Sequence, residues 1–263
     1  MPAASALRLQ IENLLEGRFP AALSPVARAV GEVASTGISE VDRLLEGGLP
    51  VGAISEITGP ASSGRTSLTL SFIAQRTAEN RVCAWVDAND ALDPESAAAN
   101  GVNLCRLLWV RCQDVAAGVR KGDKRHSMSE KKPWTKLDQA LRATDLLLQA
   151  AGFAAIVLDL GDTAPEHGTR IPLATWFRFR QAADRTRCSL VVLGQAPYAQ
   201  SSAALGLECS PLQAETTGGT VMRGFTYSLQ RGRRRFASLP LNERKPPAST
   251  WSAGATWETE KRA

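Results

Sequence analysis

The stretch "GPASSGRTSL", residues Gly59 to Leu68, decides the fold of this 263-residue chain. Its two glycines have the spacing of a phosphate-binding loop, G-x-x-x-x-G-K-[ST]. An apolar run, Ala53–Thr58, precedes it, and a helical pattern, Thr66–Glu79, follows it. In such a strand–loop–helix unit, successive backbone N–H groups point inward and hold phosphate oxygens. The sequence therefore predicts a cradle formed by Gly59, Ser62, Ser63, Gly64, Arg65 and Thr66.

Arg65 stands where the loop pattern has lysine. Lysine places a compact charge between two phosphates, whereas arginine carries a wide planar fork on a longer stem. Arginine still attracts phosphate, but it is expected to stabilise a transferring phosphoryl group less well. The loop is therefore either a working nucleotide site with an altered cation or a scaffold that has lost turnover.

Asp159 closes the apolar run "AAIVLD" within Ala154–Leu160. An aspartate at the carboxyl end of a buried strand commonly holds a metal ion or its water shell near the phosphate loop. Asp159 and the Thr66 hydroxyl are thus the candidate Mg²⁺ ligands if a nucleotide binds. The alternative is an aspartate that caps the turn at Gly161 and Asp162.

Continuous apolar runs predict parallel strands that are buried on both faces of a sheet. The runs are Ala53–Thr58, Val82–Ala88, Leu107–Cys112, Ala154–Leu160 and Ser189–Ala196. Helical patterns cover Thr66–Glu79, Thr135–Ala151 and Pro172–Arg185, and Thr135-x-x-Asp138 has the form of a helix cap. This alternation predicts an α/β fold with a doubly wound, mainly parallel sheet. Two later runs, Gly224–Arg231 and Arg234–Leu241, predict an antiparallel edge hairpin that turns at Gly232.

Composition divides the chain into three expected parts: an N-terminal helix and linker (1–35), a core (36–243) and a flexible tail (244–263). The helix places Leu7, Ile11 and Leu14 on one face, which can dock on its own domain or on another chain. The tail carries Trp251 and Trp257, and exposed tryptophans there favour binding of a partner protein. Folding back onto the domain is the alternative.

The bulk properties exclude several classes of protein. The five cysteines form no C-x-x-C pair and the two histidines lie in no ligand-spaced cluster, so neither a disulfide framework nor a structural metal is expected. No apolar run is long enough to span a membrane or to serve as a signal peptide. A cytoplasmic protein is expected. The net charge of +5 permits contact with nucleic acid without requiring it.

Three segments resemble the RecA recombinase family in the correct order. They are "TGISEVDRLLEGGLPVGAISEITGPASSGRTSLTL" (Thr36–Leu70), "VDANDALDPESAAANGVNLCRLLW" (Val86–Trp109) and "ETTGGTVMRGFTYSLQRGRR" (Glu215–Arg234). The resemblance implies a RecA-like phosphate-loop core. It also implies that Gln195, at the end of "LVVLGQ", senses the γ-phosphate, and that Ala196–Gly218 is a mobile DNA-binding loop.

Departures from the family pattern gather at the nucleotide site. Asn89 occupies the position of the family's water-activating glutamate, and an amide cannot take a proton from water near neutral pH. Asp93 matches a position that touches adenine, but Ser96 replaces the stacking aromatic residue expected three places later. No confident catalytic residue is left. Binding of ATP with Mg²⁺ is expected to be weak or absent, unless unseen neighbours compensate for these changes.

Basic residues suggest where DNA could bind. The predicted loop, Ala196–Gly218, lies in a stretch that has no lysine or arginine between Pro197 and Thr220, which is unfavourable for binding a phosphate backbone. The insertion before Lys136 offers Arg120, Lys121, Lys124 and Arg125, although a solvated insertion explains them equally well. The predicted hairpin turn offers Arg231, Arg233, Arg234 and Arg235.

With its degenerate ATP site, the chain looks like the ImuA type of bacterial RecA-like protein. That resemblance implies an adaptor in damage-induced (SOS-type) translesion mutagenesis, associated with the nucleoid when active. The implied partners are an ImuB-like Y-family protein and an error-prone DnaE-type polymerase, with RecA itself and single-stranded DNA as further candidates. The rival hypothesis is an active, DNA-dependent ATPase of recombinase type.

Overall fold

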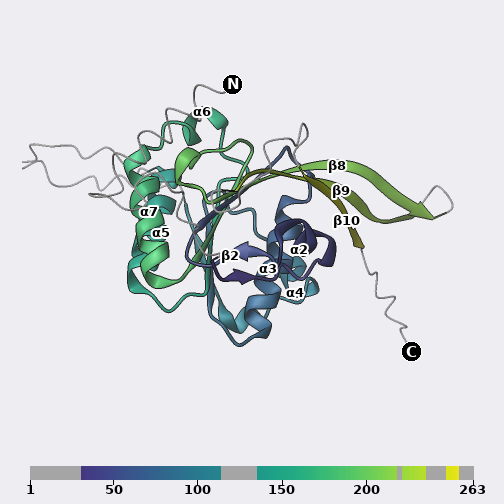
Figure 1. The fold of residues 1–263 in the computed structure, drawn as a ribbon, viewed down its shortest axis with the longest axis horizontal. Helices are drawn as coiled ribbons and strands as arrows, with labels where there is room; N and C mark the ends of the chain where they lie inside the picture. Colours follow the sequence, from purple (N-terminus) through teal and green to yellow (C-terminus); the bar gives the residue numbers. More distant parts are fainter. Residues whose placement is uncertain (1–30, 114–134, 218–220, 235–246, 255–263) are drawn as a thin grey trace, which may run out of the picture. The chain divides into compact units, whose positions relative to one another are not determined.

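The computed structural model describes residues 31–113, 135–217, 221–234 and 247–254 (Figure 1). The chain divides into two units, Met1–Gly31 and Glu32–Ala263, and the helices and strands described lie in the second. No helix in the described ranges is both long and apolar enough to cross a membrane. The predicted helix that carries Leu7, Ile11 and Leu14 lies outside the described residues.

An eight-stranded sheet in the order β10-β9-β8-β3-β7-β6-β4-β5 forms the centre of the fold. The strands from β8 through β3 to β5 are parallel neighbours, whereas β8–β9 and β9–β10 are antiparallel. Their bounds are β3 Ile54–Thr58, β4 Cys83–Asp87, β5 Leu107–Arg111, β6 Ala155–Asp159, β7 Ser189–Gly194, β8 Leu205–Thr217, β9 Val221–Arg234 and β10 Ala248–Gly254. A separate two-stranded sheet pairs β1 (Val33–Ala34) with β2 (Leu49–Pro50).

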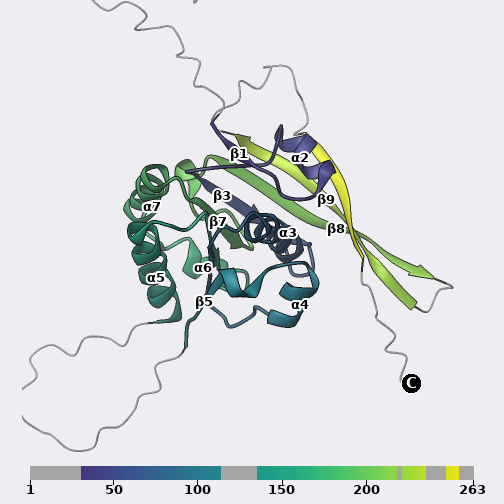
Figure 2. The same cartoon turned by 90° about the horizontal axis from the view of Figure 1, so that it is seen from below.

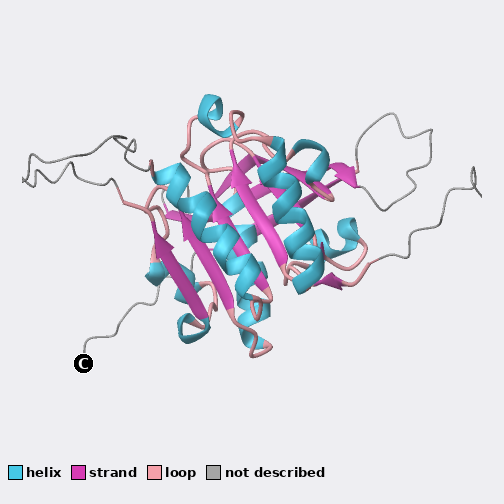
Figure 3. Cartoon of the chain, turned by 90° about the vertical axis from the view of Figure 1, so that its left-hand side faces the viewer, coloured by secondary structure: helices cyan, strands magenta, loops and turns pink. Residues whose placement is uncertain are grey.

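Helices cover both faces of the sheet, as a doubly wound fold requires. On one face, α2 and α3 bury Leu45, Leu68 and Phe72 against the strands. On the other, α5 and α7 bury Leu148 and Trp176 (Figures 2 and 3). The helix bounds are α2 Ser39–Leu45, α3 Arg65–Ala78, α4 Pro94–Ala99, α5 Lys136–Ala150, α6 Pro165–Gly168 and α7 Leu173–Thr186, with short 3₁₀ turns η1 Leu104–Arg106 and η2 Gln200–Ser202.

The parallel strands and the long helices confirm the predicted α/β fold. The five predicted apolar runs form β3, β4, β5, β6 and β7, and the three helical patterns form α3, α5 and α7. The predicted cap is also present: the Thr135 hydroxyl accepts the N–H of Asp138, and the Asp138 carboxylate accepts the N–H of Thr135, each at 3.1 Å. This reciprocal pair fixes where α5 begins.

The antiparallel edge of the sheet is formed by other strands than the sequence predicts. Gly232 does not mark a turn, because β9 runs through it without a break from Val221 to Arg234. The hairpin is formed by β8 and β9 instead, and Gly218-Gly219 stands in the connection between them. A glycine pair is a stronger signal for a hairpin turn than a single glycine such as Gly232.

The loop predicted over Ala196–Gly218 is also wrong for most of its length. Residues 205–217 form β8, which lies between β3 and β9. Leu205, Leu207 and Cys209 alternate along the strand and pack into the core beside α3. That period-2 pattern is the signal of a strand with one buried face. The family resemblance predicted a mobile DNA-binding loop here, whereas this local pattern indicates a strand.

The prediction of a flexible tail over 244–263 is also partly wrong. Residues 248–254 form β10, which pairs with β9 in register from Ala248↔Gln230 to Gly254↔Gly224. Trp251 is 4% exposed, and its ring lies 4.7 Å from that of Tyr227. Trp251 therefore contributes to the core and is not an exposed partner-binding residue. Trp257 lies outside the described residues.

Candidate functional site

The loop from Gly59 to Gly64 joins β3 to α3 at the carboxyl edge of the sheet. Both glycines are required by their surroundings. A Cβ at Gly59 would meet the carbonyl oxygen of Cys209, and one at Gly64 would lie 2.7 Å from the ring of Tyr227 and 2.9 Å from that of Trp251. Gly64 also has a φ of +85°, a conformation that favours glycine. Residues of β9 and β10 therefore pack directly against the phosphate loop.

The Arg65 side chain is turned into the protein and is not presented to solvent. The residue is 7% exposed. Its Nη1 donates to the carbonyls of Gly59, Pro60 (3.3 Å) and Gly194 (3.4 Å). Its Nη2 donates to the carbonyl of Gly161 at 2.9 Å. One guanidinium therefore connects the carboxyl ends of β3, β6 and β7.

The other predicted loop residues divide by exposure. Ser62 and Thr66 are exposed at the surface of the loop, where a hydroxyl could meet a ligand. Ser63 is buried, and its Oγ has no hydrogen-bond partner within the described ranges. The loop therefore joins the predicted strand to the predicted helix, and the Arg65 guanidinium is bound to backbone carbonyls.

Asp159 ends β6 beneath the same loop. Its Oδ1 accepts the N–H of Gly161 at 2.9 Å, which is the turn-capping role left open by the sequence. Burial raises the pKa of Asp159 to about 6, and the neighbouring charge of Asp87, its register partner on β4, adds to this. A carboxyl group with a raised pKa binds a metal ion in competition with its own proton.

Asn89 stands at the carboxyl edge beside β6. Its Nδ2 donates to the Thr163 hydroxyl at 3.3 Å, so the amide has a structural partner. The adjacent Asp90 forms two hydrogen bonds to Arg111, at 2.6 and 2.5 Å, and these lower the pKa of the Asp90 carboxyl. Asp90 is therefore paired with Arg111.

Asp93 and Gln195 are both engaged in local hydrogen bonds. Asp93 caps α4 by accepting the N–H groups of Glu95 and Ser96. The pKa of its carboxyl is lowered, first by the hydrogen bond from the Ser96 hydroxyl and then by these N–H groups. Gln195 Nε2 donates to the Gly161 carbonyl at 3.1 Å. That carbonyl is the one that Arg65 also contacts. The structure thus brings Arg65, Asp159 and Gln195 together around Gly161.

Sequence comparisons place this site in a family context. Residues 22–117 match the family model described as the RecA N-terminal domain. The chain is 31% identical to protein RecA of Bordetella petrii over 227 residues, which cover 81% of this chain and 56% of that protein. Protein RecA of Ruegeria pomeroyi is 32% identical over 62% of this chain and 45% of its own length. The chain is therefore similar to RecA proteins over much of its own length.

The fold of this chain has a solved counterpart. A crystal structure of the RadB recombinase superposes with a TM-score of 0.56 at 16% identity, over 83% of this chain and 94% of that chain. At that identity the likeness is one of fold. The chain spans about half the length of the two RecA proteins named above.

The basic residues proposed for DNA are only partly placed. Arg231 is 8% exposed, and its Nη1 donates to the Leu44 carbonyl and to Glu46 at 3.0 and 3.1 Å. It joins β9 to α2, so it is not available to phosphate. Arg233 and Arg234 lie at the end of β9, where only the backbone is described. The remaining candidates lie outside the described residues: Arg120, Lys121, Lys124, Arg125 and Arg235.

Proposed function

We propose that this chain is a RecA-like adaptor in DNA repair, of the kind that serves damage-induced translesion mutagenesis, and that it turns over little or no ATP. The observation that carries the proposal is the position of Arg65. Its guanidinium is bound to the backbone carbonyls of Gly59, Pro60, Gly161 and Gly194. In this arrangement the phosphate loop serves as a scaffold for the carboxyl edge of the sheet.

Nucleotide binding would have to draw Arg65 away from those carbonyls. A hydrogen bond from a charged donor contributes about 1.5–3 kcal/mol, and a buried carbonyl that loses its donor carries a desolvation cost. Two such bonds are comparable with the whole free energy of millimolar binding, about 4 kcal/mol. Thr66 and Asp159 offer oxygen ligands for Mg²⁺, but we expect the loop to bind the nucleotide only weakly while Arg65 stays bound to these carbonyls.

Hydrolysis lacks a base as well. Asn89 occupies the position of the general base, and loss of such a base commonly lowers the rate by roughly 10²–10⁴-fold. The nearest replacement in sequence, Asp90, is paired with Arg111. Both the binding step and the chemical step are therefore expected to be impaired.

The resemblance to the ImuA type supplies the proposed partners. They are an ImuB-like Y-family protein and an error-prone DnaE-type polymerase, with RecA and single-stranded DNA as further candidates. Leu7, Ile11, Leu14 and Trp257 remain the candidate docking residues. Trp251 is not among these candidates because its side chain is buried.

A steady-state ATPase assay of the full chain, with and without single-stranded DNA, tests the loss of turnover. We expect phosphate release no faster than that of the Asp159→Ala variant under both conditions. DNA-stimulated release that disappears in Asp159→Ala would instead establish the rival, a recombinase-type ATPase. Binding of a fluorescent ATP analogue should be weak in the wild type and tighter in Arg65→Lys.

Size-exclusion chromatography with the purified partners tests the adaptor role separately. We expect co-elution with the ImuB-like protein, the DnaE-type polymerase or both, and the same behaviour in the Arg65→Lys variant. Absence of co-elution with either partner would overturn the adaptor proposal, whatever the ATPase assay shows.

A further inference from the structure

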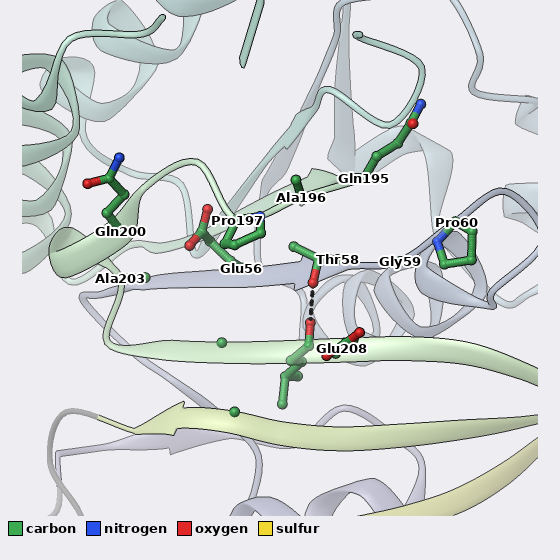
Figure 4. Close-up of a pocket in the computed structure, with 13 residues that line it drawn as sticks. Glu56, Thr58, Gly59, Pro60, Gln195, Ala196, Pro197, Gln200, Ala203 and Glu208 are labelled. Carbon is green, nitrogen blue, oxygen red and sulfur yellow. Dashed lines mark hydrogen bonds between the residues drawn. The ribbon is translucent and has the colours of Figure 1, made fainter. Parts of the chain in front are cut away.

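A cavity of about 570 Å³ lies at the carboxyl end of β3, under the segment 195–203 (Figure 4). This volume is typical of sites that hold a small molecule. Glu56 pairs with Gly206 and Thr58 with Glu208, so these side chains face the same side of the sheet. The alternate residue, Ile57, packs into the core beside α3. The cavity therefore opens on the sheet face opposite α3.

Two glycines on neighbouring strands give the cavity its depth. Gly206 of β8 and Gly232 of β9 both line it. The nearest atom to a Cβ added at Gly232 would be the carbonyl oxygen of Gly206, at 3.6 Å, which is an ordinary contact. The strand does not require glycine there for steric reasons. The missing side chain leaves open volume over the sheet.

Two carboxylates give the cavity its charge. Glu56 is 3% exposed, and its Oε1 accepts the N–H groups of Tyr198 and Ala199, each at 2.6 Å. Figure 4 shows Glu56 rising from β3 toward Pro197. Glu208 is exposed on the same face of the next strand. Across the part of the chain that the structure describes, neither glutamate forms a salt bridge, and no lysine, arginine or histidine lines the cavity.

A buried carboxylate without a counter-ion is costly, and here burial raises the pKa of Glu56. Two hydrogen bonds from N–H groups hold Oε1, but Oε2 has no hydrogen bond to any described residue. A cation in the cavity would supply both the missing charge and the missing donor. Gly59 and Gln195 of the nucleotide site also line the cavity, but its two carboxylates would repel a phosphate group.

We propose that this cavity binds a cationic head group on an aliphatic stem, with the chemistry of an arginine side chain. A guanidinium offers several donors in one plane, so it can pair with the buried Glu56 carboxylate, while the exposed Glu208 adds negative charge to the same cavity. The hydroxyl of Thr58, which donates to the Leu207 carbonyl at 3.1 Å, can still accept a hydrogen bond (Figure 4). Pro60, Pro197 and Ala203 supply apolar walls for the methylene stem.

Calorimetric titration of the full chain tests this site. The probes are agmatine, N-acetyl-arginine amide, and N-acetyl-citrulline amide as the neutral analogue. We expect at least one of the two guanidinium compounds to bind, at least about tenfold more tightly than the citrulline compound. Preference for agmatine would identify a free ligand, and preference for the blocked arginine would identify a side chain of a partner protein.

Three variants separate the cavity from the rest of the surface. Glu56→Gln keeps an acceptor for Tyr198 and Ala199 but removes the charge, and Glu208→Gln removes the rim charge. Each is expected to weaken guanidinium binding roughly tenfold or more. Gly232→Val fills the cavity and is expected to abolish binding.

Glu95→Gln, an exposed carboxylate outside the cavity lining, is the matched control and should bind as the wild type does. Thermal unfolding of each variant establishes that it is folded. Equal binding of the arginine and citrulline compounds would overturn the proposal. So would wild-type affinity in all three cavity variants.

Discussion

The parallel and antiparallel parts of the sheet are built from different kinds of sequence. The central parallel strands β3, β4, β6 and β7 are short and almost completely buried. The antiparallel strands β8 and β9 are much longer, and β8 is exposed at every residue from Pro211 to Thr216. Continuous apolar runs identify the first kind of strand locally. The second kind has one exposed face for part of its length, so its apolar residues alternate with polar ones and give a weaker local signal.

The difference has a consequence for the phosphate loop. The loop belongs to the parallel part, but Tyr227 of β9 and Trp251 of β10 lie against Gly64. A second contact, from Arg231 to the Leu44 carbonyl, joins β9 to α2. The antiparallel part therefore helps to hold a loop that has Arg65 where the phosphate-loop pattern has lysine.

Removing the Trp251 ring should have the largest effect. Trp251→Ala deletes a buried aromatic side chain between β10 and the loop, and such substitutions commonly cost about 3–5 kcal/mol of the free energy of unfolding. Urea denaturation of the full chain measures this loss. If β10 were a loosely attached tail, the variant would unfold at the same urea concentration as the wild type.

The neighbouring residue provides the matched control. Thr250 is exposed on the same strand, and Thr250→Ala should change stability by less than about 0.5 kcal/mol. Gly64→Ala in the wild-type and Trp251→Ala backgrounds then measures how the two parts are coupled. Because the added Cβ clashes with the Trp251 ring, its cost should be smaller when that ring is absent.

The carboxyl edge of the parallel part should show a smaller effect that depends on pH. The pKa of Asp159 is raised to about 6 in the folded protein, whereas an unfolded aspartate has a pKa near 4. Between these values the folded state binds more protons, so stability falls as pH rises, by up to roughly 1.4 kcal/mol per pH unit. Asp159→Asn should remove this slope and stabilise the protein near neutral pH by roughly 1–3 kcal/mol.

Unfolding free energies of the wild type and Asp159→Asn, measured from about pH 4 to pH 7, test this sign. Glu56 also has a raised pKa and contributes to the wild-type slope, so the informative quantity is the difference between the two proteins. Parallel curves would show that Asp159 is not desolvated as the structure indicates.

The sequence was sufficient wherever local pattern and burial agree. The runs that became β3, β4, β6 and β7 are apolar because both faces are covered, and the loop at Gly59 has a fixed spacing. The sequence was insufficient where the burial of a side chain depends on contacts with residues far away along the chain. Trp251 lies in a polar segment, but its ring packs against Tyr227 and Gly64, which are distant in sequence. Arg65 shows the same limit, because no local pattern reveals that its guanidinium contacts carbonyls at the ends of three different strands.

The α5 cap should have the smallest of these effects, and it tests the claim that local sequence defines the parallel part. Thr135→Ala removes the acceptor for the Asp138 N–H and should cost about 1 kcal/mol. Thr135→Ser keeps the hydroxyl and should be close to the wild type. Urea denaturation of both variants, with circular dichroism as the probe, measures the difference. Equal losses in the two variants would mean that the threonine methyl group matters more than the cap, so that packing, and not the local hydrogen bond, determines where α5 begins.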